Sequence, residues 1–575
     1  MSDHARLGMP APEVHQDRFL WVILLIFIII IGLFFRVNNL SAKSLWSDEF
    51  ATIASVNGQS IDPTAFERTG KSLDPQMPEP AVDYRGKATL PMIPTLDCGP
   101  TIRVLRNNIH PPLFFCMMQP VLRTVGSNPV SLRILPIVFA TLCLPMIFLL
   151  GRGLRVYALD DEDTLQARQR RGNALGLVTA AIFALSAYQV AHAQDARPYT
   201  LTLLIAITSA WWLLRTIHFV ATHPSGDPAR SPWYPWVVMS LLSAVGLYSQ
   251  YFYGFYLVFL YAFALWMVRP FGPKLRLRVL VSAGLTTLLF LPWLPILLHQ
   301  LSFFREGGHY TMGLWNPLHV PEKLWRVFAA FIMPESAIGS IFMLVVCLSV
   351  SVVYLRKLFS REAYGRRISY AVQMALAWMA TLIVMQIVLD LVQNTHTLSI
   401  KRYLILASPA FALLVAHSLL VLQRLLRQTF PALTRLPKYW LVMTFCVWMG
   451  VHTWQLQSGD ALISEDFLNA AGYINDHVQI REAVLVHKSG APAIGIAYYL
   501  NDAIPVRGLH EDHKKGLPLS DLGAISADYD GLWVVYSHAA ESNTVRINNA
   551  LMHLGYTVAE TQPFKGITLI RYRRP

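Results

Sequence analysis

The chain has 575 residues, of which 54% are hydrophobic and 14% charged, and its formal net charge is +13. This composition excludes a single soluble domain and is typical of a protein that crosses a membrane several times. The positive charge lies mainly in short connections between apolar runs, so it indicates membrane topology and attraction to anionic lipid, not nucleic-acid binding.

About eleven segments approach the length of about 20 apolar residues that a membrane-crossing helix needs. The first follows a short polar start and has a longer apolar run than a signal peptide, and no small-residue cleavage site follows it, so we interpret it as a retained anchor. The fifth and sixth are short and meet within the sequence GLYSQYFYG. The segments cover residues 19–35, 130–150, 173–191, 199–219, 233–249, 251–268, 279–298, 338–356, 370–391, 403–422 and 439–456.

Lys and Arg are concentrated in four of the connections, at 151–172, 269–278, 356–367 and 424–438. With eleven spans, all four connections lie on one side of the membrane, and the positive-inside rule makes that side cytoplasmic. The N-terminus is then inside and the C-terminus outside. We expect an integral protein of a bacterial inner membrane.

Two outer regions before the tail are longer than simple connections, which indicates function or disorder. The first covers about 36–128 and includes a Pro-rich insertion at about 60–108. The second, at about 299–337, mixes aromatic and basic residues and predicts a lid or docking helix. Cys98 and Cys116 both fall in the first region, and their pairing stays open because no framework spacing supports it.

The hydrophobic pattern changes after the last apolar segment, which divides the chain into a transmembrane domain at 1–456 and a tail at 457–575. Apolar runs with a period of two or with short continuous stretches predict strands, and those with a period near 3.6 predict helices. The tail therefore predicts a small α/β domain outside the membrane, with helices at 465–478 and 544–556 and strands at 482–487, 531–537 and 566–574.

Two groups of charged residues lie at the outer ends of apolar segments. Asp48 and Glu49 stand in LWSDEF soon after the first segment, and they are either solvated loop charges or functional acids in an apolar setting. Asp195 and Arg197 stand in AQDARPYTL, where almost no loop joins the third and fourth segments. They are either an ion pair that caps the following helix or part of a site at the mouth of the bundle.

Two further groups of polar residues on the same, outer side of the membrane need an explanation. His110 precedes two prolines in NNIHPPLFF, and the apolar stretch that follows is too short to span and predicts a helix in the membrane interface. Lys401 and Arg402 begin the tenth segment, against the positive-inside bias. These two side chains either extend to lipid headgroups or bind a lipid-linked phosphate, for which Arg offers a bidentate fork.

Taken together, these motifs resemble those of the GT-C superfamily of integral-membrane glycosyltransferases. The nearest branch holds the protein O-mannosyltransferases and the bacterial lipid A aminoarabinose transferases. The resemblance covers most of the chain and rests on the order and common sidedness of its motifs. These are LWSDEF after the first span, HPPLFF before a juxtamembrane helix, AQDARPYTL between the third and fourth spans, RYLILASPAF at a late span, and the outer α/β tail.

The resemblance implies a polyprenyl phosphate donor that carries one sugar, and transfer at the outer face of the membrane. It makes Asp48 the general base, Glu49 its assistant or a residue that positions the acceptor, and Asp195 the second acid. It makes Arg402 a ligand of the donor phosphate, with Lys401 as helper. His110, Arg197 and Tyr199 are expected to position the acceptor or donor.

These residue types suit the reaction, because displacing a lipid phosphate from an anomeric carbon needs a base and positive charge beside the leaving group. One such displacement inverts the anomeric centre. Asp48, Glu49 and Asp195 are also the ligands that a divalent cation would use, and metal dependence stays open.

The sequence leaves the acceptor open among an envelope glycan, lipid A or another glycolipid, and a protein. The long insertion departs from the family pattern, and so does the tail, which is a small α/β module and not the β-trefoil of the eukaryotic O-mannosyltransferases. A transporter or flippase of lipid-linked sugars is the alternative function. Transporters place polar groups near the midplane on broken helices, often in repeated halves, whereas these acids gather at outer ends and the sequence shows no repeat.

Overall fold

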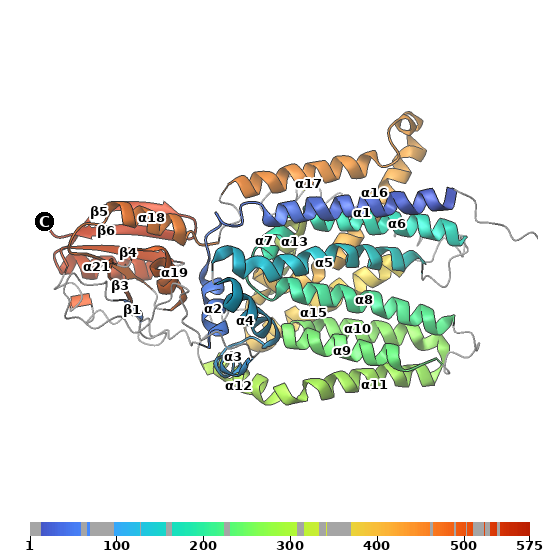
Figure 1. Ribbon diagram of the computed structural model, residues 1–575, viewed down its shortest axis with the longest axis horizontal. Helices are drawn as coiled ribbons and strands as arrows, with labels where there is room; N and C mark the ends of the chain where they lie inside the picture. The colour runs from blue at the N-terminus through green and yellow to red at the C-terminus, as the bar shows by residue number, and fades with distance from the viewer. Residues whose placement is uncertain are drawn as a thin grey trace, which may run out of the picture.

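The computed structural model describes residues 13–58, 66–68, 97–126, 128–156, 164–222, 231–306, 316–332, 341, 370–459, 464–487, 490–501, 503–509, 522–523, 529–537 and 541–575. Long helices lie side by side in one part of the molecule, and the C-terminal sheet forms the other end (Figure 1). Short helices from the first outer region lie where the two parts meet. The expected span at 338–356, apart from Ile341, and most of the insertion at 60–108 lie outside the described residues.

The long helices are mostly apolar, as the sequence predicts, and their bounds follow. They are α1 (Glu13–Val37), α5 (Pro129–Val156), α6 (Leu165–Leu185), α8 (Tyr199–Ala221), α9 (Tyr234–Ser249), α10 (Tyr253–Val268), α11 (Pro273–Phe290), α12 (Leu294–Glu306), α15 (Tyr370–Gln393), α16 (Ser408–Thr429) and α17 (Trp440–Ser458). Single 3₁₀ turns η2 (Arg269–Phe271), η3 (Leu291–Trp293) and η7 (Pro431–Arg435) join some of them.

Within the described part of the chain, seven helices are long and apolar enough to cross a membrane. The third expected span is instead a pair, α6 and α7 (Ala187–Ala193), bent by 63° at Ser186. The fifth is only 16 residues long, and α17 is less apolar than the seven. A polytopic helical architecture is therefore confirmed, but the count of about eleven spans is not.

Helix α5 lies against α1, α6 and α8, and it carries a residue that is central to the site described below. Its close approach to α6 depends on two glycines, because a Cβ added at Gly151 would lie 2.9 Å from the Cα of Gly176. Small residues of this kind let helix backbones approach each other inside a membrane.

Several short elements gather at the tail end of the bundle (Figure 1). Helix α4 has 13 residues and follows two prolines, as expected for the stretch after His110. Helix α13 belongs to the second outer region and packs against α7 and α16. The short elements are α2 (Ser47–Val56), α3 (Gly99–Leu105), α4 (Leu113–Val125), α13 (Val320–Ile332), and the 3₁₀ segments η4 (Pro317–His319), η5 (Thr397–Ser399) and η6 (Lys401–Ala407).

A disulfide joins Cys98, just before α3, to Cys116 in α4, and the two Cα atoms are 5.5 Å apart. This settles a pairing that the sequence left open. The bond fixes α3 against the helix that follows His110.

We expect the double variant C98S/C116S to lower the free energy of unfolding by about 3 kcal/mol, because the bond closes a loop of 18 residues in the unfolded chain. Chemical denaturation in detergent measures this difference. Cys446→Ser is the control, because Cys446 is a free thiol that is partly buried. An unchanged free energy of unfolding in the double variant would contradict the disulfide.

Five strands of the tail and one strand of the insertion form a six-stranded mixed sheet in the order β1-β3-β2-β4-β6-β5. The tail's three buried strands β2, β4 and β6 and its helices α18 and α21 lie where the sequence predicts them. The sequence missed α19, β3 and β5. The elements are β1 (Phe66–Arg68), α18 (Phe467–His477), β2 (Glu482–Val486), α19 (Ala491–Tyr499), β3 (Val506–Gly508), β4 (Gly531–Ser537), α21 (Glu541–His553), β5 (Thr557–Phe564) and β6 (Ile567–Arg573).

One edge of this sheet does not come from the tail. Strand β1, from the insertion, pairs antiparallel with β3, with Phe66 opposite Gly508. Within the rest of the sheet, β2 runs parallel to both β3 and β4, whereas β6 is antiparallel to β4. The insertion and the tail thus form one sheet.

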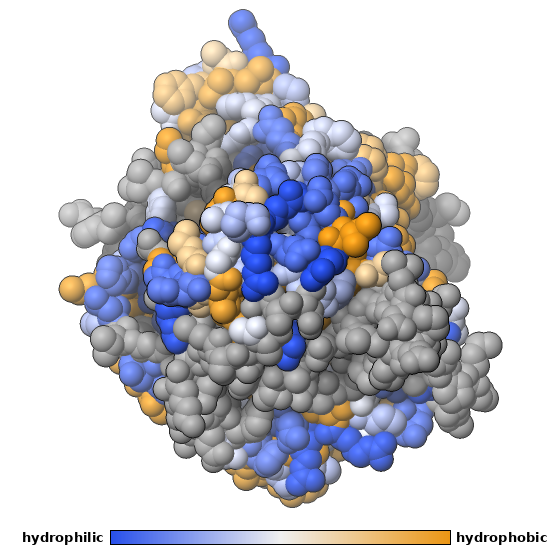
Figure 2. Space-filling model, turned by 90° about the vertical axis from the view of Figure 1, so that its left-hand side faces the viewer, coloured by the Kyte–Doolittle hydropathy of each residue, from blue (hydrophilic) through white to orange (hydrophobic). Residues whose placement is uncertain are grey.

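The tail contacts helix α2 through aromatic and polar groups. The Phe50 ring lies 5.4 Å from that of Tyr498 and 6.2 Å from that of Phe467. The buried Glu465 carboxylate accepts a hydrogen bond from the Ser47 backbone N–H at 2.7 Å. Seen from the tail end, hydrophilic side chains cover much of the centre of the described surface, with hydrophobic ones scattered around them (Figure 2). The tail therefore holds the start of α2 and presents a largely polar face.

Candidate functional site

A cavity of about 590 Å³ is lined by residues of α2 and of the segment before α4, elements that lie at the end of the helix bundle that faces the tail (Figure 1). Its wall is built by α2, the segment before α4, the start of α8, the α9–α10 junction, α12, the end of α15 and η6. Helix α13 contributes none of the described residues that line it, but Gln300 and Leu301, at the start of the second outer region, do line it. Five of the residues predicted from the sequence line the cavity: Asp48, His110, Arg197, Tyr199 and Arg402.

Asp48 faces two guanidinium groups in this cavity. Its Oδ2 lies 3.6 Å from Nη2 of Arg402 and 4.0 Å from Nε of Arg197. The Asp48 side chain is 31% exposed, so a substrate can reach it. An acid and two cations from three distant parts of the chain therefore meet in one place.

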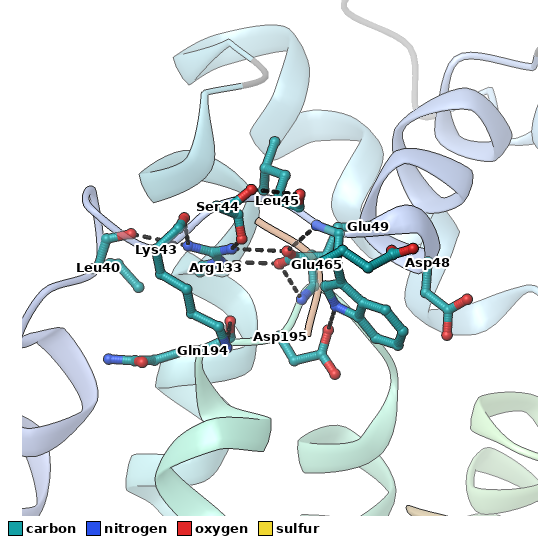
Figure 3. A network of polar contacts seen from close by, with 12 residues as sticks. Leu40, Lys43, Ser44, Leu45, Asp48, Glu49, Arg133, Gln194, Asp195 and Glu465 are labelled. Atoms are coloured by element: carbon teal, nitrogen blue, oxygen red, sulfur yellow. Dashed lines mark hydrogen bonds and ion pairs between the residues drawn. The ribbon is translucent and has the colours of Figure 1, made fainter. Parts of the chain in front are cut away.

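Glu49 points in a different direction, because successive residues in a helix are about 100° apart. Its side chain is fully buried and forms a bidentate ion pair with Arg133 of α5, at 2.9 Å from Nε and 2.8 Å from Nη2. In Figure 3 the Asp48 carboxylate lies apart from this network. Glu49 does not line the cavity.

The buried Arg133 also fixes the chain that leads to α2. Its guanidinium donates hydrogen bonds to the carbonyl groups of Leu40 and Lys43 at 2.9 Å and of Ser44 at 3.0 Å (Figure 3). Glu49 in turn accepts from the Ala196 backbone N–H at 3.0 Å. One buried ion pair therefore ties the start of α2 to α5 and to the turn before α8.

Asp195 is buried behind the cavity. Its Oδ1 accepts a hydrogen bond from the Trp46 indole N–H at 2.8 Å, and its Oδ2 lies 3.7 Å from Nδ1 of His192. Burial raises the pKa of this carboxyl, but the hydrogen bond and charge of His192, the charge of Lys43 and the Trp46 hydrogen bond together hold it below its usual value. Among the described residues, the Asp195 carboxylate forms no ion pair with Arg197, so the ion-pair cap that the sequence allowed is not formed; the two residues are joined instead by the Arg197 backbone N–H, which donates to the Asp195 carbonyl at 2.7 Å.

Trp46 connects Asp195 to the cavity wall. The guanidinium carbon of Arg402 lies 5.3 Å from the centre of the Trp46 ring, a cation–π distance. The same carbon lies 5.8 Å from the Tyr403 ring. Asp195 therefore orients an aromatic ring that in turn supports Arg402.

His110 and Arg197 contact each other, with 2.6 Å between Nε2 of the histidine and Nη2 of the arginine. The His110 ring also stacks on Phe115, with centroids 5.8 Å apart. Burial lowers the pKa of Arg197, but the nearby charges of Asp48, Tyr199 and Asp195 together outweigh it, so the pKa lies above its usual value. Lys401 does not line the cavity, and its backbone carbonyl accepts from the Tyr188 hydroxyl at 2.9 Å.

The three predicted carboxylates do not fit a shared metal ion. Both Glu49 oxygens accept from Arg133, one Asp195 oxygen accepts from Trp46, and Asp48 faces two guanidinium groups whose charge opposes a cation. Over the described residues, no group of three His, Cys, Asp or Glu side chains is arranged to hold a metal.

Several site residues were not found by sequence reasoning. Arg133 stands near the start of an apolar segment, where an arginine is ordinarily a headgroup contact. Gln250 and Tyr251 lie in the GLYSQYFYG junction. The sequence showed that two short apolar segments meet there, but it did not show that the junction lines a cavity. At the depth of a membrane, backbone outside helices is tolerated where it lines a cavity, and this signal could have found the junction.

Lys43 provides a pH-dependent contribution to stability. Its ammonium donates to the Gln194 carbonyl at 3.3 Å. Burial and the nearby charge of Arg133 lower its pKa from 10.5 to about 8, although the charges of Glu49 and Asp195 oppose this. Between these two pH values the unfolded chain binds more protons at this residue than the folded one, so the free energy of unfolding rises with pH.

We therefore expect Lys43→Met to flatten this rise. The measurement compares the free energy of unfolding of the wild type and the variant, in the same detergent, at pH values from 8 to 10. The difference between the two proteins removes the titration of all other groups. Equal slopes in the wild type and the variant would contradict the assignment.

Comparison with known proteins gives a match in structure but not in sequence. No protein-family model and no curated protein sequence matches the chain. Among solved structures, ArnT from Cupriavidus metallidurans in the apo state is 11% identical and covers 96% of this chain and 98% of its own, with a TM-score of 0.52. The structure of the same protein bound to undecaprenyl phosphate is also 11% identical and covers 96% of this chain and 98% of its own, with a TM-score of 0.48.

The archaeal oligosaccharyltransferase AglB from Archaeoglobus fulgidus, in complex with an inhibitory peptide and a dolichol-phosphate, is a more distant neighbour. It is 9% identical and covers 96% of this chain and 74% of its own, with a TM-score of 0.44. ArnT is an aminoarabinose transferase, and both neighbours are GT-C membrane glycosyltransferases. With the apolar helices, the ArnT match makes this chain an integral membrane protein, and it has the GT-C fold that the sequence motifs predicted.

Proposed function

We propose that the chain is a glycosyltransferase that moves a sugar from a polyprenyl-phosphate-linked donor to an envelope acceptor at the outer face of a membrane. The observation that carries the proposal is the contact between Asp48 and Arg402, 3.6 Å apart in one cavity. An acid beside a cation is the pair that displacement of a phosphate by a hydroxyl requires. The ArnT-like fold supports it.

In this mechanism Asp48 accepts the proton of the acceptor hydroxyl as its oxygen attacks the anomeric carbon. The bond between that carbon and the phosphate oxygen breaks, and the phosphate leaves with its electron pair. Arg402 binds the leaving phosphate, with Arg197 beside it. A single displacement of this kind inverts the anomeric centre.

The other predicted residues act through these groups. Glu49 positions α2 through its ion pair with Arg133. Asp195 positions Trp46, on which Arg402 lies. His110 and Tyr199 border the cavity beside Arg197 and position the substrates. We give no direct substrate contact to Lys401, which does not line the cavity.

The outer location is part of the proposal. Disulfides persist in oxidising compartments, so the Cys98–Cys116 bond supports an outer position for the elements around the cavity. We propose a bacterial inner membrane, with the tail and the cavity on the periplasmic side. An envelope glycan is the preferred acceptor, followed by lipid A or another glycolipid, and then a protein.

The test incubates the full-length protein in liposomes with radiolabelled polyprenyl phosphosugars and, separately, envelope glycan, lipid A and protein acceptors. We expect label to move to one acceptor class with release of polyprenyl phosphate. Label that crosses the bilayer on its lipid, without transfer to any acceptor, would contradict the proposal and favour a flippase.

A further inference from the structure

The α9–α10 junction provides an uncommitted polar group in the cavity. Gln250 follows the last residue of α9 in an extended conformation. Its backbone N–H donates to the Gly246 carbonyl and its carbonyl accepts from the Tyr253 N–H, both at 3.1 Å. The backbone of Gln250 is therefore satisfied inside the protein, and only its side chain remains to be explained.

The side chain of Gln250 lines the cavity and is only 7% exposed. Among the described residues, its side-chain oxygen has no hydrogen-bond partner. A buried polar atom without a partner is costly, and it needs a reason. Rotation of the carboxamide by half a turn exchanges its oxygen and nitrogen, so either atom can face a bound molecule.

Neighbouring polar side chains differ from Gln250, because they are used within the protein. The Tyr251 hydroxyl accepts from the Trp293 indole N–H at 2.8 Å and donates to Gln300. The Gln300 amide nitrogen donates to the Leu105 carbonyl at 2.7 Å. These bonds hold the wall of the cavity rigid around a carboxamide that is left for a ligand.

The junction also touches the segment that carries the phosphate-binding arginine. The Phe252 ring lies 4.8 Å from that of Tyr403, which follows Arg402 in the chain. A group bound at Gln250 therefore lies in the same cavity as the donor phosphate, on a wall connected to it. A carboxamide offers both a donor and an acceptor, which matches a hydroxyl, whereas an ionised phosphate oxygen only accepts.

The charges of the cavity restrict what the ligand carries. Among the described residues that line it, the formally charged side chains are Asp48, Arg197 and Arg402, and Asp48 is within 4.0 Å of both arginines. Among these described residues, an ammonium group on the sugar finds no acid that is not already paired with an arginine. Burial of such a charge without its own partner is strongly unfavourable.

We propose that Gln250 binds a hydroxyl group of the donor sugar, and that this sugar is uncharged, without an ammonium group. The inference rests on the proposed function and deepens it by naming the substrate class. It separates this chain from its structural neighbour ArnT, an aminoarabinose transferase.

The test measures binding of three lipids to the full-length protein in detergent. They are polyprenyl phosphate, the same lipid carrying arabinose, and the same lipid carrying 4-amino-4-deoxyarabinose. The two sugar lipids differ by a hydroxyl in place of an ammonium. We expect the wild type to bind the arabinose lipid about tenfold more tightly than the amino-sugar lipid.

Two variants then test the residue. Gln250→Leu should weaken binding of the arabinose lipid by about three- to tenfold and leave that of polyprenyl phosphate unchanged. Gln250→Glu supplies an acid and should shift preference toward the amino-sugar lipid. Gln423→Leu is the matched control, because Gln423 is 5% exposed and does not line the cavity, and it should leave the preference unchanged.

The outcomes are distinguishable. Tighter binding of the amino-sugar lipid by the wild type would overturn the neutral-sugar inference and leave the transferase proposal standing. An equal effect of Gln250→Leu on all three lipids, or none on any, would overturn the role of Gln250. If no lipid binds to the wild type, the proposed function itself fails.

Discussion

Asp48→Asn is expected to lower the rate of sugar transfer by at least about a hundredfold, because a positioned general base contributes roughly 10²–10⁴. The amide keeps the shape of the side chain but cannot take the proton of the acceptor hydroxyl. Because Arg402 and Arg197 then lose a nearby negative charge, binding of the donor phosphate should stay the same or become tighter. The loss should therefore appear in kcat and not in KM for the donor.

The transfer assay with radiolabelled donor measures this effect. Asp530→Asn is the control, because Asp530 is an exposed acid in the tail, paired with Arg481 and remote in sequence from the cavity residues. Thermal unfolding in detergent checks that each variant is folded. Transfer by Asp48→Asn at the wild-type rate would remove Asp48 from the mechanism and leave the fold unaffected.

The sequence could predict those parts of the site that are carried by local signals. Asp48, Arg197 and Arg402 each stand at the end of an apolar segment, where a charge is conspicuous, and the resemblance gave their order. All three line one cavity. Membrane topology alone places these segment ends on the outer side of the membrane. The three residues could therefore be grouped without knowing how the helices pack against one another.

The division of roles between neighbours was not predictable. Asp48 and Glu49 are adjacent in LWSDEF, and no local pattern says which of them faces the cavity. The partner of Glu49 is Arg133, which is 84 residues away in the chain. Such a pair depends on how α2 docks on α5, and it is a property of the tertiary structure.

The tail shows the same limit. Strands β2 and β4 are buried throughout, and their continuous apolar runs predict them well. Strand β5 is mostly exposed and polar, and β3 has only three residues, so neither has a clear pattern of its own. Strand β1 comes from the insertion and is a strand because it pairs with β3. Among the strands, those that are defined by their partners are the ones that sequence reasoning missed.

Removal of Glu49 has the largest expected effect on stability. Glu49→Gln leaves the Arg133 guanidinium buried without its counter-ion, and breaking a buried ion pair in this way costs about 3–5 kcal/mol of the free energy of unfolding. Arg133→Met should be similarly harmful, because it leaves a buried carboxylate. The double variant E49Q/R133M removes both charges, so it should be more stable than either single variant.

A double-mutant cycle on the free energy of unfolding in detergent measures this coupling. Recovery in the double variant is the decisive outcome, because a catalytic Glu49 with no structural role would give additive or negligible effects on stability. Transfer activity provides the second readout. If Glu49 only positions α2, activity should return in part with stability in E49Q/R133M, whereas a stable double variant without transfer would mean that Glu49 takes part in the chemistry beside Asp48.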